Sequence, residues 1–312
     1  MAGKIVIPEQ LKQDLPPNKW GKILGVTPIV MTVIATMLAG LASSEMTRAQ
    51  YDRSFAAQLQ SKVGDQWNFF QGKKLRGAVQ RSTLDLMAAT GQIRPLDREA
   101  LAVALAGTPA ALVLDTEGGR RALAALVDGA LPKLEAGAAT PAEVKAALEA
   151  ADGTRLDADL DVLVAKASPG QLAEALRETQ AQAQAFDVLN KPIAPAIAQM
   201  ERQLVRSGTD AAFRRDFIAA RILYESLRYD TESKLNQAVA GVLELQVHKS
   251  NLSAERHHSR SQKFFYGMLA AQMGVVIATL AMAARQRSLL WSLAAGAGTA
   301  AIAFALYVYL YL

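Results

Sequence analysis

Histidine is the first residue type to weigh for metal or acid–base chemistry, because the 312-residue chain contains no cysteine. His257 and His258 are adjacent, so they point to different sides of a helix, whereas paired metal ligands on one helix face prefer a spacing of four. Glu255 can share a face with His258, but a third ligand is missing and His248 is too distant. We therefore predict no metal site and expect His257 and His258 to lie near lipid headgroups.

An acidic run invites a calcium interpretation. Asp157, Asp159 and Asp161 alternate as calcium ligands do in a helix-loop-helix site. Such a loop needs glycine at its sixth position and glutamate at its twelfth, where this chain has Val162 and Ser168. The run is better interpreted as solvated residues around a helix start.

Other catalytic patterns are missing as well. The glycine pair at 118–119 lacks the lysine and threonine of a phosphate-binding loop, and no strand precedes it. The sequence contains no serine nucleophile elbow and no paired-carboxylate signature. We predict no catalytic residue and no cofactor, and we do not expect an enzyme.

The most informative cluster gathers amide, aromatic and charged side chains in residues 65–74. The residues that we assign to packing or assembly are Asp65, Gln66, Trp67, Phe69, Phe70, Gln71 and Lys74. On a helix Trp67, Phe70 and Lys74 share one face, and Gln66, Phe69 and Lys73 share another. Such a surface packs against neighbouring helices, with the glutamines setting the register; a ligand or ion site is the alternative.

Three apolar stretches must position these residues relative to a membrane. Residues 23–42, 264–284 and 289–310 each supply about the 20 mostly apolar residues that a spanning helix needs. Lysines before the first stretch and small residues after it also fit a secretory signal. We expect an uncleaved anchor, because the apolar run exceeds the short core of a signal peptide.

The composition of the spans argues against a transporter. Their interiors carry no ionisable residue, the usual mark of an ion or proton pathway. Small residues recur four apart instead, a spacing that lets helices approach closely. These pairs are Thr36 with Gly40, Gly267 with Ala271, Gly274 with Ala278, and Ala294 with Gly298.

The segments between the spans predict an all-α stalk and head. Apolar residues Phe55, Leu59, Val63, Trp67 and Phe70 form one stripe on a helix that leaves the first span. A returning helix has steps of three and four, a coiled-coil seam with one stutter. Its positions are Phe217, Ala220, Tyr224, Leu227, Thr231, Leu235, Ala238, Val242, Leu245 and Leu252. The two helices pair as an antiparallel stalk or associate with copies from other chains.

Between the stalk helices we expect a small, alanine-rich head of five or six short helices and no strand. Asp97, Thr140 and Ser168 are the predicted helix caps, with proline following the last two. The predicted organisation is an N-terminal segment at 1–22, a first span at 23–42, an outgoing stalk at 43–94, a head at 95–207, a returning stalk at 208–263, and spans at 264–284 and 289–310.

Charge suggests how the chain sits in a membrane. Arg285 and Arg287 lie in a short hairpin, which the positive-inside rule places in the cytoplasm. The head and stalk then face the periplasm or exterior of a cell inner membrane, although basic residues also crowd the opposite interface. The predicted interface residues are Trp20, His257, His258, Arg285, Arg287 and Trp291. The net charge of +5 thus fits anionic lipid rather than nucleic acid.

The segment from Gln60 to Lys74 resembles a bacterial membrane family, domain of unknown function 4337. The resemblance rests on Asp65-Gln66-Trp67, the aromatic pair Phe69-Phe70 and the following lysines, just after a first span. The histidine pair before the second span and the Arg-rich hairpin agree with it. The resemblance covers roughly residues 20–90 and 210–312, with the head as an insertion, and implies architecture only.

These features favour a non-enzymatic, membrane-anchored scaffold that assembles into a homo-oligomer or organises a larger membrane complex. The head would hold a membrane protein partner. An oligomeric channel or force-sensing pore with a hydrophobic gate is the alternative, because such gates need no charged residue. A third hypothesis is an accessory subunit of a membrane enzyme complex.

Overall fold

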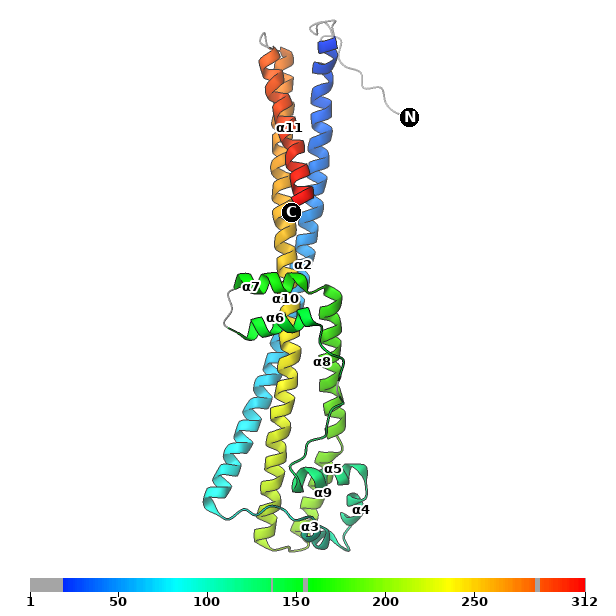
Figure 1. The fold of residues 1–312 in the computed structure, drawn as a ribbon, viewed down its shortest axis with the longest axis vertical. Coiled ribbons are helices and arrows are strands. Elements are labelled where there is room, and N and C mark those ends of the chain that lie inside the picture. The colour runs from blue at the N-terminus through cyan, green and yellow to red at the C-terminus, as the bar shows by residue number, and fades with distance from the viewer. Residues whose placement is uncertain (1–18, 136, 154–156, 284–286, 312) are drawn as a thin grey trace. The chain divides into compact units, whose positions relative to one another are not determined.

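The computed structural model describes residues 19–311, except 136, 154–156 and 284–286, and every regular element in that part is a helix. The helices are α2 (Lys19–Thr90), α3 (Arg98–Leu105), α4 (Ala111–Leu114), α5 (Glu117–Val127), α6 (Ala142–Asp152), α7 (Asp157–Lys166), α8 (Pro169–Asn190), α9 (Ile193–Arg206), α10 (Ala211–Ala283) and α11 (Arg287–Tyr311). The predicted all-α class is confirmed (Figure 1).

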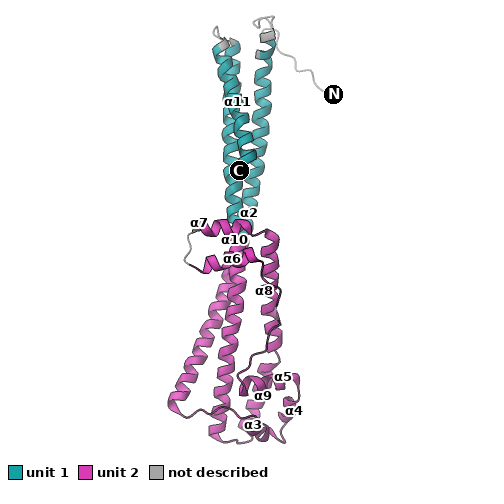
Figure 2. Ribbon diagram, in the orientation of Figure 1, with its two compact units in different colours: residues 1–56, 250–312 teal, residues 57–249 magenta. Residues whose placement is uncertain are grey.

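Three of these helices are long and apolar enough to cross a membrane: α2, α10 and α11. The long helices α2 and α10 run antiparallel, as predicted (Figure 1). The chain divides into two compact units (Figure 2). Unit 1 comprises residues 1–56 and 250–312, and unit 2 comprises residues 57–249, so α3–α9 share a unit with the stalk segments of α2 and α10.

Helix α2 buries one side with a strict seven-residue repeat. In unit 2 the repeat is formed by the buried or half-buried residues Leu59, Val63, Gln66, Phe70, Lys73, Gly77, Gln80, Leu84 and Met87, and the half-buried Trp67 lies beside it. Met31, Ala35, Leu38 and Ala42 keep the same register in unit 1. A repeat averaging 3.5 residues per turn is the pattern of a coiled-coil seam. The predicted stripe was wrong at Phe55, whose side chain is 43% exposed and lies outside this repeat.

The predicted seam of α10 is buried or half-buried at nine of its ten positions and is wrong at one, Ala238. Ala238 is exposed, whereas its neighbours Val239 and Leu243 are 2% exposed. Both pack with Leu59 and Val63 of α2, and Leu176 of α8 packs against the same cluster. Because α10 is covered by more than one helix, its buried residues do not follow a single two-helix seam.

Seven helices occupy the part of 95–207 that the structure describes, more than the five or six expected. Their largest core joins α3, α4, α5, α9 and α10. The residues that make up this core are Leu96, Leu101, Leu105, Ala110, Ala122, Ala125, Leu126, Ile193, Ala196, Ile197, Met200, Leu204, Phe217 and Tyr224. The short helices therefore gain stability by packing on one long helix.

Two of the three predicted caps are confirmed. Asp97 accepts a hydrogen bond from Ala100 N, and Ser168 forms a capping box with Gln171. Thr140 is not a cap. Helix α6 begins at Ala142 with Pro141 at the N-cap, because the ψ of 140° at Pro141 is extended and helical geometry starts one residue later.

The three apolar helices of unit 1 meet through small residues. Ala271, Ala294 and Ala301 are each fully buried. A Cβ at Gly274 would lie 3.4 Å from the Ala294 carbonyl oxygen, so the backbones of α10 and α11 approach closely there. Thr36 and Gly40 do not join this contact, because both are exposed.

Candidate functional site

Trp67 and Phe70 of segment 65–74 lie on α2, and Trp67 contacts α10. The Trp67 indole donates a hydrogen bond from Nε1 to Glu244 Oε1 over 2.6 Å. Its ring meets the Phe70 ring edge-on at 5.1 Å, and Lys74 Nζ lies 5.2 Å from the Phe70 centroid. Trp67, Phe70 and Lys74 therefore interact in a row along one side of the helix.

The neighbouring side of the same segment lines a small cavity. Gln66, Phe69 and Lys73 face α8 and α10 across a volume of about 280 Å³. Asp187 of α8 and Asn236 of α10 add polar groups to its wall. This cavity is the part of the segment that most resembles a ligand site.

Two residues of the cavity wall, Lys73 and Glu232, belong to an ionic cluster. Glu232 of α10 pairs with Lys73 of α2 and, over 3.2 Å, with Arg228. The Glu232 side chain is only 8% exposed, so it is a largely desolvated carboxylate held by two cations. Lys73 and Arg228 also lie over the Tyr229 ring, at 5.5 and 4.7 Å from its centroid.

The remaining predicted members of the segment are largely exposed. Asp65, Gln71 and Lys74 are exposed, and the Phe69 side chain is 57% exposed although it borders the cavity. The structure therefore divides the segment between a half-buried contact surface and a free surface.

Further polar contacts join α2 to α10 beyond residue 74. Gln80 donates from Nε2 to Glu225 Oε2 over 2.8 Å, and Ser226 Oγ donates to the Gly77 carbonyl oxygen over 3.3 Å. Arg221 lies 3.8 Å from Glu225 and 3.7 Å from Glu201 of α9. These contacts make the relative register of α2, α9 and α10 specific.

Tyr224 is a buried titratable group of unit 2 with a raised pKa. Its hydroxyl donates to Asn190 Oδ1 over 3.0 Å, and Asn190 in turn donates to the Phe186 carbonyl oxygen. Burial raises the pKa of Tyr224 to about 12. The hydroxyl therefore stays protonated at neutral pH and serves as a structural hydrogen-bond donor.

Arg228 carries a charge that its surroundings favour. Burial lowers the pKa of the Arg228 guanidinium, but the Glu232 carboxylate and its neighbours outweigh burial, so the net shift is upward. The cation thus stays in place as a partner for Glu232.

The predicted membrane-interface residues form contacts of their own in unit 1. His257 Nδ1 lies 2.6 Å from Glu45 Oε2, with the two side chains 19% and 12% exposed. His258 Nε2 lies 3.0 Å from Gln262 Nε2, and Trp291 Nε1 donates to Thr27 Oγ1 over 3.2 Å. The side chains of Trp20, Arg285 and Arg287 lie outside the described residues.

Comparison with known proteins assigns one part of the chain to a protein family. Residues 20–110 match the family model described as Domain of unknown function (DUF4337). The chain carries a DUF4337 domain. It includes the first candidate span, segment 65–74 and α3, and its last matched residue is Ala110. No curated protein and no solved structure matches the chain.

The DUF4337 domain supplies one side of every α2 contact described above. The expected resemblance over 20–90 is confirmed, whereas the resemblance over 210–312 and the insertion of the head stay predictions. The partners Glu232, Glu244 and Glu225 all come from α10, which the match does not include.

Sequence reasoning missed two long-range contacts near α7. Asp161 Oδ1 lies 2.6 Å from His248 Nε2 of α10. Lys249 Nζ donates to the carbonyl oxygens of Val164 and Ala165 at the end of α7, where a cation is favoured by the helix dipole. Their sequence separations of 84–87 residues left no local signal.

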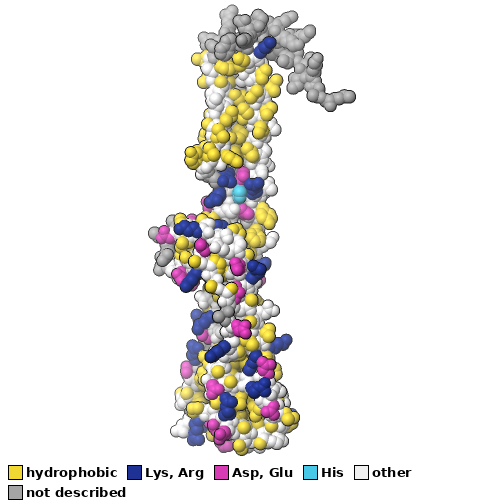
Figure 3. Space-filling model, turned by 45° about the vertical axis from the view of Figure 1, so that its right-hand side comes forward, with side chains coloured by type: hydrophobic (Ala, Val, Ile, Leu, Met, Phe, Trp, Pro, Cys, Tyr) yellow, Lys and Arg dark blue, Asp and Glu magenta, His cyan; other side chains and the backbone are white. Residues whose placement is uncertain are grey.

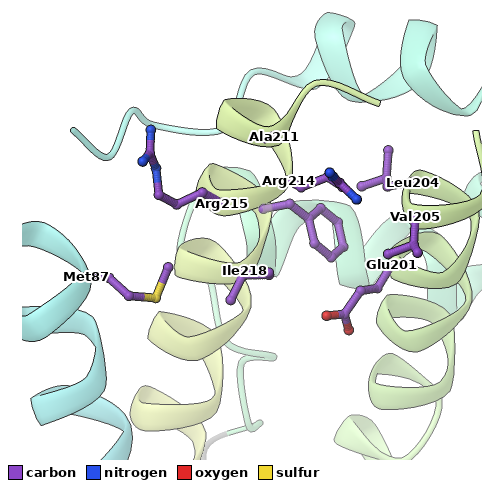
Figure 4. A pocket seen from close by; sticks show the side chains of 9 residues that line it. Met87, Glu201, Leu204, Val205, Ala211, Arg214, Arg215 and Ile218 are labelled. Carbon is purple, nitrogen blue, oxygen red and sulfur yellow. The ribbon is translucent and has the colours of Figure 1, made fainter. Parts of the chain in front are cut away.

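A second cavity of about 290 Å³ lies among α2, α9 and α10 (Figure 4). Its charged walls are Glu201, Arg214 and Arg215, and the remaining walls are apolar. Glu201 is already paired with Arg221. The carboxylate that lines this cavity is therefore engaged in an ion pair.

The described residues also contain no group of three or more histidine, cysteine, aspartate or glutamate side chains placed to hold a metal ion. The α10 carboxylates Glu225, Glu232 and Glu244 are each engaged by a donor on α2. These hydrogen bonds and ion pairs fix the register of α2 against α10.

Proposed function

We propose that the protein is a membrane-anchored, non-enzymatic scaffold that assembles into a homo-oligomer through the DUF4337 domain. Three candidate spans indicate a multi-pass membrane protein that associates with a lipid bilayer. The contacts of the DUF4337 domain described above bind helices to one another, which suits a structural role.

The observation that carries the proposal is an exposed apolar stripe on α2, formed by Leu75, Val79 and Leu86. These side chains are 68%, 56% and 64% exposed. With the exposed Ser82 they follow one another in steps of four, three and four residues, the spacing of a coiled-coil seam. Leu86 is two residues from the half-buried Leu84, so the stripe lies on the opposite side of α2 from the buried repeat.

Large apolar side chains aligned on a helix outside the membrane favour a partner. Burying each side chain contributes roughly 1.5–3 kcal/mol of free energy, so the three side chains together can stabilise a helix–helix contact. A second copy of the chain is the partner that we propose. Copies anchored in one bilayer share an orientation, so their α2 helices meet in parallel with equal residues opposite each other.

Cysteine cross-linking in native membranes tests this contact, since the chain has no cysteine of its own. Leu86→Cys places a thiol in the exposed stripe and should yield a covalent dimer on mild oxidation. Ala88→Cys is the matched control, because Ala88 is also exposed and lies at nearly the same height on α2 but points away from the stripe.

Two results would refute the proposal. One is equal cross-linking of both variants, which would indicate random collision; the other is a monomeric mass for the wild-type protein in mild detergent. Electrical recording in planar bilayers provides a further check, because a steady conductance would favour the pore alternative over a scaffold.

A further inference from the structure

We propose that unit 1 binds an anionic phospholipid in a groove between α2 and α11, with the lipid phosphate held by Arg48 and Arg260. The groove has a volume of about 590 Å³. Its apolar walls include Ile34 and Leu41 of α2 and Leu306 of α11. This site is separate from the exposed stripe on α2 and from the assembly proposed above.

The groove is built into the packed structure of unit 1. Phe264 and Val308 line it and are only 6% and 1% exposed, because they also belong to the core of the three-helix unit. Side-chain collapse cannot fill the groove without disturbing that core. An occupant from outside is the simplest way to cover it.

The apolar part continues along the same two helices. A second cavity of about 520 Å³ shares Ile34 and Ile302 with the first and extends to Trp291. From Arg48 to Ile34 the α2 axis rises about 21 Å, which equals the thickness of one bilayer leaflet with its headgroups, roughly 20–22 Å. One acyl chain therefore fits between the arginine end and the shared residues.

The other end of the groove is cationic. Arg260 is half-buried, and its Nε atom has no hydrogen-bond partner. Arg48 lies 3.4 Å from Glu45, but Glu45 is also engaged by His257 and the Arg48 side chain is 62% exposed. The described lining of the groove thus contains two guanidinium groups and one carboxylate, which is already engaged. The remaining positive charge suits a phosphate, which guanidinium groups bind in a bidentate manner.

The position of these arginines favours a lipid over other anions. On the face drawn in Figure 3, hydrophobic side chains predominate on the three-helix part of unit 1, and basic, acidic and histidine side chains gather where this band ends. A soluble phosphate would leave the apolar groove empty. A span from a second copy would fill the groove but bring no acid, since residues 25–42, 264–283 and 289–310 contain no aspartate or glutamate.

Native mass spectrometry of the full-length protein tests the site. The purified protein is equilibrated in detergent with an equimolar mixture of phosphatidylglycerol and phosphatidylcholine, and the retained lipids are counted for each chain. The wild type should retain one phosphatidylglycerol in preference to phosphatidylcholine. Arg48→Gln with Arg260→Gln should lower that retention by roughly tenfold or more, because two charged hydrogen-bonding groups are lost.

Arg53→Gln is the matched control, because Arg53 is an exposed arginine of α2 outside the groove. It should retain phosphatidylglycerol as the wild type does, and circular dichroism should show that all variants keep their helical content. Equal retention by the double variant, or no lipid preference in the wild type, would overturn the proposal. Release of the lipid by inorganic phosphate alone would overturn it in favour of a simple anion site, and a changed oligomeric mass in the double variant would overturn it in favour of a second copy.

Discussion

The carboxylate of Glu232 should be the most costly single charge to remove from unit 2. It is 8% exposed and pairs with Lys73 on α2 and Arg228 on α10. Glu232→Gln removes two charged hydrogen bonds, each worth roughly 1.5–3 kcal/mol, but keeps a neutral acceptor. Because both cations retain partial access to water, we expect a net loss of about 2–4 kcal/mol in the free energy of unfolding.

Removing the charge of Lys73, the partner of Glu232 on α2, should lower the free energy of unfolding by less. Lys73→Met leaves Glu232 with Arg228 as its partner, and Lys73 is 28% exposed, so we expect about 1 kcal/mol. The double variant should lose less than the sum of the two single losses, because the contact that they share can be lost only once.

Thermal melting of the full-length protein in detergent, followed by circular dichroism, measures these losses. In a unit of about 190 residues, 1 kcal/mol shifts the melting temperature by about 2–4 °C, so Glu232→Gln should lower it by about 4–16 °C. Asp230→Asn is the control, since Asp230 pairs with Lys234 on the surface of the same helix and should change the melting temperature by under about 2 °C. A Glu232→Gln shift no larger than that of Asp230→Asn would refute the reasoning.

Three further predictions concern single contacts. Trp67→Phe keeps an aromatic ring but removes the donor to Glu244, so melting of the full-length protein should show a loss of about 1–3 kcal/mol. The pKa of Tyr224 is raised from 10.0 to about 12 in the folded protein, so its contribution is complete below pH 10 and is lost as the pH rises to 12; the melting temperature of the wild type should fall more steeply over that window than that of Tyr224→Phe. A Cβ at Gly119 would overlap the Val113 carbonyl oxygen, so Gly119→Ala should increase proteolysis of the head, whereas Gly170→Ala, where the nearest atom is 3.9 Å away, should not.

The two sides of α2 suggest how one helix serves two purposes. Its buried repeat contacts α10 through residues of different types. Examples are the small Gly77, the apolar Val63 and the charged Lys73. Its exposed stripe keeps Leu75 and Leu86 more than half exposed within the chain. A helix with two such sides is suited to joining an internal contact to an external one.

Local patterns in the sequence were sufficient for several features. The three apolar stretches predicted the candidate spans because a bilayer imposes a minimum apolar length on a helix. Asp97 and Ser168 predicted helix starts because a cap needs only residues within one turn. The motif around Trp67 predicted the DUF4337 domain, which the family match confirms.

Only the tertiary structure determined which residues of these helices are buried and which side chains pair. The burial of Val239 rather than Ala238 depends on α8 and α2 both packing on α10, and no spacing within α10 records that. The partners of Trp67, Lys73 and His257 lie 177, 159 and 212 residues away. Charge pairing and burial arise from the meeting of distant segments, so the sequence alone determined which helices form, and their packing determined which side chains interact.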